Sequence, residues 1–229
     1  MNLLRSHPNC ALILSANLGS FDPEIPWAKQ RKWDNGMPFA VCRLNDACFP
    51  PRHKAMTSRM QPGLIKMFGW QFFPGFDFYI WVDGSKTITS PDFGAYMMHA
   101  LGKADMAVFK HPQRRTIKEE YEFVKEKMAG GNQYLLSRYD GEWLDEQYRA
   151  IASDRLFKDE CLYASTGFVY RPNARIKQAF KEWWYHKTRY LLHDQLALPY
   201  ALARAKVKVN VIDASIYKLP HWEHTRPRR

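Results

Sequence analysis

Short apolar runs of strand length recur along the chain, and segments with helical spacing of apolar residues separate them. The run at residues 76–82 is apolar on both faces, which is typical of a central strand buried between two helix layers. The runs at 11–16 and 39–44 are bounded by polar or turn residues, as strands usually are. Six runs are expected to form strands: residues 11–16, 39–44, 76–82, 104–110, 162–170 and 207–212.

Four segments between these runs carry helix signals. Ser90 before Pro91 predicts a cap and first turn, and Gly102 predicts the end of that helix. Thr116 and Glu119 form a capping-box pattern ahead of an amphipathic segment that continues to residue 130. Further helices are expected at 141–153 and at 176–187, where one face is shared by Ile176, Phe180, Trp183 and Lys187.

This alternation of strands and helices predicts an α/β fold with a mostly parallel sheet and helices on both faces. A chain of 229 residues can bury one sizeable core, and we find no repeat or linker that would mark a boundary. We therefore expect one domain over residues 1–229, with 222–229 as a flexible basic tail.

Charge and cysteine content narrow the class of protein. The chain has 34 Lys and Arg against 23 acidic residues, a net charge of +11, which suits nucleic acid, an anionic membrane surface or a phosphorylated small molecule. Cys10, Cys42, Cys48 and Cys161 lack CxxC or zinc-finger spacing, so we expect reduced core thiols. We find no targeting or transmembrane segment and expect a cytoplasmic protein.

Candidate chemistry begins where the run 76–82 ends, at Asp83-Gly84-Ser85. In open α/β sheets, ligands bind beyond the carboxyl ends of the strands, and a carboxylate there can hold a divalent cation that neutralises a diphosphate. The same three residues also suit a turn that simply ends the strand. Spacing alone leaves both interpretations open.

Several motifs in order along residues 52–212 resemble GT-A type glycosyltransferases. They are most similar to the glycosyltransferase-like family first described in plants as a domain of unknown function, and they share features with retaining family-8-like hexosyltransferases. The resemblance implies a GT-A-like, Rossmann-like fold. The motifs are FPGFDFYIWVDGS (73–85), FKHP (109–112) with Arg114 or Arg115 and Glu119-Glu120, LYASTGF (162–168), Trp183-Trp184 and DQL (194–196).

The resemblance implies a metal site, Mn²⁺ or Mg²⁺, of the D-x-D type, with Asp83 as principal ligand. Ser85 stands where that motif has its second aspartate, and a hydroxyl is a weaker ligand than a carboxylate. His221 is the candidate for a further ligand near the C-terminus. Packing against Pro220 and Trp222 is the alternative role for this histidine.

The resemblance also implies a donor-sugar site. Asp194 and Gln195 correspond to a catalytic pair beside the anomeric carbon, where they would stabilise an oxocarbenium-like centre. As a plain sequence feature, Asp194 also suits a helix N-cap. Thr166 and Gly167 correspond to a turn that brings the backbone against the donor sugar, although a strand bulge would explain Gly167 as well.

Other positions are candidates for the nucleotide, the phosphates or the acceptor. The nucleotide sugar is expected near the ends of the first strands, with Ala16, Asn17, Arg43 and Gly84. Lys66 could reach a phosphate or could lie on a helix surface. A cationic cluster at a strand end could bind phosphate or an acidic acceptor, and it consists of Lys110, His111 and Arg114.

Taken together, these features predict a metal-assisted, retaining hexosyltransferase that uses a nucleotide-diphosphate sugar, expected to be a UDP-sugar, and a glycan or glycolipid acceptor. An inactive GT-A-like domain that binds a nucleotide or glycan remains an alternative, because Ser85 departs from the motif. A nucleic-acid-binding protein is a weaker alternative, since the basic residues are spread along the chain and form no known DNA- or RNA-binding motif.

Overall fold

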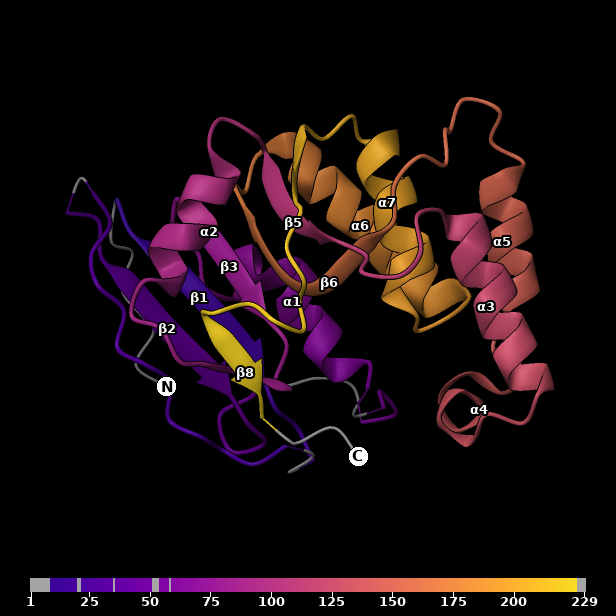
Figure 1. Ribbon diagram of the computed structural model, residues 1–229, viewed down its shortest axis with the longest axis horizontal. Helices are drawn as coiled ribbons and strands as arrows, with labels where there is room; N and C mark the ends of the chain where they lie inside the picture. The colour runs from indigo at the N-terminus through magenta and orange to yellow at the C-terminus, as the bar shows by residue number, and fades with distance from the viewer. Residues whose placement is uncertain (1–8, 20–21, 35, 51–53, 58, 226–229) are drawn as a thin grey trace.

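The computed structural model describes residues 9–19, 22–34, 36–50, 54–57 and 59–225 (Figure 1). Its centre is a six-stranded sheet in the order β2-β1-β3-β6-β5-β7. The six expected strands are confirmed, with small differences at their ends: β1 (Ala11–Ala16), β2 (Phe39–Leu44), β3 (Phe78–Val82), β5 (Met106–Lys110), β6 (Tyr163–Tyr170) and β7 (Val209–Ile212).

The sheet is mixed but mostly parallel. β1 pairs in parallel with β2 and β3, and β5 pairs in parallel with β7. Only β6, in the middle, runs antiparallel to both of its neighbours, β3 and β5. The expected α/β fold with a mostly parallel sheet flanked by helices is therefore confirmed, and the carboxyl ends of β1, β3 and β5 meet at one edge.

Helices cover both faces of the sheet because side chains alternate along each strand. Leu12 and Leu14 of β1 pack in the core with α1, α6 and α7, whereas Ala11 and Ile13 face the core that contains α2. The helices are α1 (Gln61–Phe72), α2 (Phe93–Leu101), α3 (Ile117–Ala129), α4 (Gln133–Tyr139), α5 (Leu144–Ala152), α6 (Ala174–Arg189) and α7 (Asp194–Arg204).

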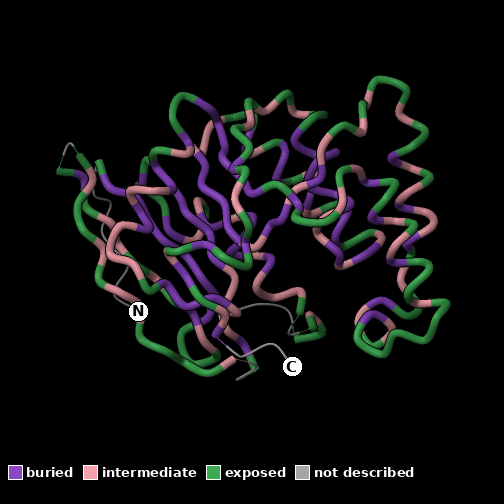
Figure 2. Tube along the Cα trace, in the orientation of Figure 1, coloured by how far each residue is buried: buried purple, intermediate pink, exposed green. Residues whose placement is uncertain are grey.

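The helices α3, α4 and α5 form a lobe beside the sheet and not on it (Figure 1). Ile117, Val124 and Leu135 from this lobe share a third core with Leu196 and Tyr200 of α7. Figure 2 shows the resulting pattern: inner strands that are mostly buried, edge strands β2 and β7 that carry exposed residues, and lobe helices in which buried and exposed residues alternate. Among the described residues, none of the helices has the length and apolar character to cross a membrane.

Local signals in the sequence account for several helix ends. The predicted cap at Thr116 is confirmed, because its Oγ1 accepts a hydrogen bond from the Glu119 amide at 3.1 Å. The capping box is formed only in part, since the Glu119 carboxylate accepts from the Arg115 amide at 2.6 Å and not from the Thr116 amide. The helix α2 begins later than Ser90 and Pro91 predict: Pro91 and Asp92 lie in a turn, and the helix begins at Phe93. Gly102 ends α2 as expected, with a φ of 49° that favours glycine.

Two helices escape a periodicity analysis. In α1, Ile65, Lys66 and Met67 are consecutive buried residues, so the helix lacks the one-sided apolar stripe from which helices are predicted. Gly63 and Gly69 also lower its helix propensity. The helix α4 has only seven residues, which is about two turns and too short to show a period.

The C-terminal segment is part of the fold and is not a tail from residue 222. Strand β8 (Trp222–His224) pairs antiparallel with β4 (Lys86–Ile88). Trp222 is buried between Phe93 and Phe109, and its indole N–H donates to the Ile216 carbonyl at 3.1 Å. The expectation of a flexible tail over 222–229 is thus wrong for 222–225, while 226–229 lie outside the described residues.

The expectation of core thiols holds only in part. All four cysteines are free, and Cys10 is buried beside β1. Cys42 and Cys161 are half-buried, whereas Cys48 is exposed. Burial raises the pKa of Cys42 to about 11, so this thiol stays protonated near neutral pH.

We expect Trp222→Ala to lower the free energy of unfolding by about 3–5 kcal/mol, because it leaves a large cavity between β8, α2 and the sheet. Urea unfolding followed by circular dichroism would measure the loss. Leu156→Ala is the control, since Leu156 is 89% exposed and should change stability by less than about 0.5 kcal/mol. Equal stability of the two variants would contradict a buried C-terminal strand.

Candidate functional site

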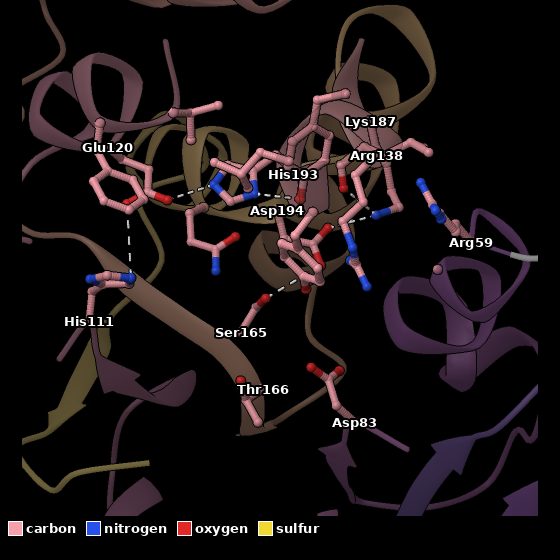
Figure 3. A pocket seen from close by; sticks show the side chains of 18 of the residues that line it. Arg59, Asp83, His111, Glu120, Arg138, Ser165, Thr166, Lys187, His193 and Asp194 are labelled. Atoms are coloured by element: carbon pink, nitrogen blue, oxygen red, sulfur yellow. Dashed lines mark hydrogen bonds and ion pairs between the residues drawn. The ribbon is translucent and has the colours of Figure 1, made fainter. Parts of the chain in front are cut away.

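A cleft of about 550 Å³ opens at the carboxyl ends of β3 and β5, beside the N-terminus of α7 and the lobe formed by α3 and α4. Figure 3 shows residues from these separate elements facing one another across it. The β3 end contributes Trp81 and Asp83, and the antiparallel β6 contributes Ser165 and Thr166. In open α/β sheets this edge is the usual place for a ligand.

A buried lysine joins the two sides of the cleft. The Lys66 ammonium lies 2.9 Å from Asp194 Oδ2 and 3.2 Å from Asp83 Oδ1, and it donates to Ser165 Oγ at 3.1 Å. The second carboxylate oxygen of Asp194 pairs with Lys187 at 2.9 Å. The four charged groups form one alternating chain of two lysines and two aspartates.

Mutual attraction keeps Lys66 and Asp194 ionised despite their burial. Burial disfavours the charged form of Lys66, but attraction to Asp194 and Asp83 outweighs it and raises the pKa of the ammonium. Burial likewise opposes ionisation of Asp194, but Lys187 and Lys66 hold the pKa of its carboxyl well below the usual range. Removing one partner would leave an uncompensated buried charge.

A second buried network holds the lobe to α7. His193, which directly precedes α7, contacts Glu120 Oε1 of α3 through Nε2 at 2.7 Å and the Tyr139 hydroxyl of α4 through Nδ1 at 2.9 Å. Glu120 also pairs with the Arg114 guanidinium. Burial opposes ionisation of Glu120, but His193 and Arg114 lower the pKa of its carboxyl to about 2.

His111 lies at the far end of this network. Its Nδ1 accepts hydrogen bonds from the amides of Arg114 at 3.0 Å and Gln113 at 3.4 Å, so the neutral ring carries its proton on Nε2. Burial lowers the pKa of His111 to about 4, although Glu120 favours the charged form. His111 is therefore neutral at physiological pH.

The fold brings together about half of the residues singled out in the sequence. Asp83 and Asp194, far apart in the chain, share the Lys66 ammonium. Gln195 lines the cleft, and none of the described residues forms a hydrogen bond with its side-chain amide. Lys66 is buried and is not a surface lysine. The predicted residues that line the cleft are Lys66, Asp83, His111, Arg114, Thr166, Asp194 and Gln195.

The predicted metal ligands do not assemble. His221 packs its ring against Tyr96 with centroids 4.6 Å apart, and neither His221 nor Ser85 lines the cleft. Asp83 Oδ1 already accepts from the Trp81 indole at 2.7 Å and pairs with Lys66. Within the described part of the chain, no group of three or more His, Cys, Asp or Glu could hold a metal ion. The residues around Asp83 therefore do not fit the expected Mn²⁺ or Mg²⁺.

The candidates for the nucleotide base lie next to the cleft. Asn17, Arg43 and Gly84 line a small cavity of about 80 Å³ at the ends of β1 and β2. The Asn17 amide donates to the Asp22 carbonyl at 2.6 Å, and Arg43 donates to the Ile25 carbonyl at 2.8 Å, so both side chains also hold the neighbouring loop. Asp83 lines the larger cleft and Gly84 lines this cavity, so the two openings lie side by side.

At two of the predicted site positions, Gly84 and Gly167, the lack of a side chain allows close packing within the protein. A Cβ on Gly84 would lie 2.7 Å from the Ala16 carbonyl oxygen, so glycine permits the close approach of the β3 end to β1. A Cβ on Gly167 would lie 2.6 Å from the Trp222 ring. The space above Gly167 is filled by Trp222, and the expected contact with a donor sugar has no room there.

Lys110 is separated from its sequence neighbour His111. It lies 3.8 Å from Asp213 and lines a different hollow of about 330 Å³ with Arg115 and Glu160. His111, the next residue, points into the main cleft. Successive side chains at a strand end point to opposite faces, which accounts for the difference.

Sequence reasoning missed several cleft residues. The sequence contains a signal for Lys187, which shares a helix face with the apolar residues Ile176, Phe180 and Trp183. A lysine buried with such residues needs a charged partner, and this predicts a nearby carboxylate. For the others no local pattern distinguishes them from surface or core residues. These additional cleft residues include Arg59, Arg138, Tyr139, Ser165, Lys187 and His193.

Comparisons with known proteins give structural likenesses only. No protein-family model and no curated protein matches the chain, so the resemblance to the plant-described family has no support from a family model. A glycosyltransferase involved in the glycosylation of the major capsid of PBCV-1 superposes with a TM-score of 0.45 at 10% identity, covering 89% of this chain and 82% of that one. A197 from STIV gives 0.33 at 8% identity, over 89% and 81%. At such scores and identities, neither likeness assigns a function to this chain.

We expect His111 to make stability depend on pH. The unfolded chain binds a proton at His111 below pH 6.5, whereas the folded protein does so only below about 4, so stability decreases as pH falls through this window, by up to about 3 kcal/mol. Urea unfolding of the wild type and of His111→Asn between pH 7 and pH 4 would measure it, with a smaller loss expected in the variant. Parallel pH profiles would contradict this role.

Proposed function

We propose that this chain is a glycosyltransferase that moves a hexose from a nucleotide-diphosphate sugar, a UDP-sugar in the first instance, to a hydroxyl of a glycan or glycolipid. One observation carries the proposal: Asp83 at the end of β3 and Asp194 at the start of α7 meet at Lys66 inside a cation-rich cleft. Such a cleft suits an anionic donor with a sugar placed beside α7.

The adjoining cavity suggests how the donor lies. A nucleoside would lie beside Asn17, which lines both the 80 Å³ cavity and a neighbouring hollow of about 400 Å³, and its diphosphate would pass Asp83 into the larger cleft. The sugar would then reach Gln195, which lines the cleft. Because the described residues offer the Gln195 amide no hydrogen-bond partner, it is available to the donor, whereas both Asp194 oxygens pair with lysines. In this arrangement Gln195 contacts the donor and Asp194 positions the surrounding cations.

The state of the carboxylates supports transfer with retention of configuration. Inverting transfer of a sugar needs a free general base for the acceptor hydroxyl. The three carboxylates of the cleft are already paired: Asp83 with Lys66, Asp194 with two lysines, and Glu120 with Arg114 and His193. We therefore propose that the leaving phosphate oxygen takes the acceptor proton. The bond from the anomeric carbon to that oxygen breaks, and the acceptor oxygen bonds the same face.

We expect one nucleoside diphosphate among UDP, GDP and CDP to raise the melting temperature selectively. A ligand that binds only the folded protein stabilises it by about 2.7 kcal/mol at 100 times Kd, which corresponds to roughly 5–10 °C for a chain of this size. Differential scanning fluorimetry with each nucleotide, and with the matching nucleosides as controls, would measure it. No shift with any nucleotide would refute the proposal.

We expect Gln195→Ala to lower kcat about 100-fold with the sugar donor, because its contact strengthens as positive charge develops at the anomeric carbon. The Kd for UDP, which lacks the sugar, should stay within about threefold of the wild-type value. Turnover and UDP titrations of the two proteins would show the difference. Gln178→Ala on α6 is the matched control, since Gln178 is exposed. Weaker UDP binding with unchanged kcat would place Gln195 at the nucleotide instead.

A further inference from the structure

A protein cation already stands beside the aspartate that was expected to bind a metal. Lys66, only 6% exposed, lies 3.2 Å from Asp83 Oδ1 and also pairs with Asp194 at 2.9 Å. The Trp81 indole donates to the same Asp83 oxygen at 2.7 Å. A divalent ion on this oxygen would have to approach a buried ammonium at close range, and like charges in a poorly solvated site repel strongly.

The cleft nevertheless has positive charge to offer an anion. Five Lys and Arg side chains line it, against three carboxylates. Lys66 and Lys187 are paired with the two aspartates, and Arg114 is paired with Glu120. This leaves Arg59 and Arg138, for which no carboxylate among the described residues lies within ion-pair distance. The surplus charge of the cleft therefore rests on two guanidinium groups.

These two arginines come from different segments of the chain and lie on the same side of the cleft. Arg59 precedes α1, and its Nη1 donates to the Ser137 carbonyl of α4 at 2.6 Å. Arg138 follows Ser137 in α4 and stacks on the Tyr134 ring, 4.4 Å from its centroid. Figure 3 shows both arginines beside Lys187 at one side of the pocket. Each contact uses part of the guanidinium and leaves further N–H donors for a ligand.

We propose that Arg59 and Arg138 bind the diphosphate of a nucleoside diphosphate and that this binding needs no divalent cation. The inference rests on the proposed function and specifies how its donor is held. A planar guanidinium can pair with two phosphate oxygens at once, and two of them supply the charge that a divalent ion would supply. Lys66 keeps Asp83 neutralised, so the aspartate does not repel the diphosphate.

Calorimetric titration with UDP, in excess EDTA and then in excess manganese, tests the proposal, with GDP and CDP in parallel. We expect a Kd that agrees within about threefold between the two conditions. Arg138→Gln and Arg59→Gln should each weaken binding about tenfold or more, because each removes charge-assisted hydrogen bonds to the diphosphate. Arg138→Lys, which keeps the charge but loses the two-point geometry, should lie in between.

Arg149→Gln is the matched control, because Arg149 is an exposed arginine on α5 that pairs with Glu146 outside the cleft. It should bind UDP as the wild type does. The melting temperature of each variant without ligand checks that it is folded. Since Arg59 is exposed and Arg138 half-buried, we expect both glutamine variants to fold.

The possible failures are distinguishable. Binding that is lost in EDTA and restored by manganese would overturn the metal-independent site but support the proposed function. Metal-independent binding that survives both arginine substitutions would overturn the assignment of Arg59 and Arg138. No binding of any of the three nucleotides in either condition would overturn the proposed function itself.

Discussion

The Lys66 ammonium between Asp83 and Asp194 is the interaction on which the site depends. Lys66 belongs to α1, Asp83 follows the end of β3, and Asp194 begins α7. One buried charge therefore sets the relative position of three elements. An unpaired ammonium at this depth would cost several kcal/mol, and the second aspartate oxygen needs Lys187 for the same reason. The alternating chain of charges is therefore stable only when all four members are in place.

The lobe of α3, α4 and α5 depends on a similar arrangement around His193. Both ring nitrogens of His193 are used, one by Glu120 and one by Tyr139, so the residue that precedes α7 is held by two lobe helices. The lobe thereby forms a wall of the cleft and presents Arg138 to it. Without this wall, the carboxyl edge of the sheet would be an open surface with little capacity to enclose a ligand.

Strand identity was readable from the sequence, but strand direction was not. A buried strand is apolar in either direction, so the run that forms β6 (Tyr163–Tyr170) has the same pattern whether it is parallel or antiparallel. The direction of β6 matters here, because it brings Ser165 and Thr166, in its N-terminal half, to the edge where β3 ends. The pairing of β8 with β4 escaped prediction because both strands have only three residues.

The sequence by itself determined the α/β class, the six sheet strands and the capped helix after Thr116, because these depend on local periodicity and short motifs. The resemblance to a known family singled out Asp83 and Asp194, and both line the cleft. Only the tertiary structure decided what those aspartates contact. Lys66 is close to both aspartates because α1 packs under the sheet, and no local pattern encodes that distance. The same holds for Trp222, whose ring fills the space above Gly167. Contacts between distant segments depend on how the cores pack, and that packing is a property of the whole chain.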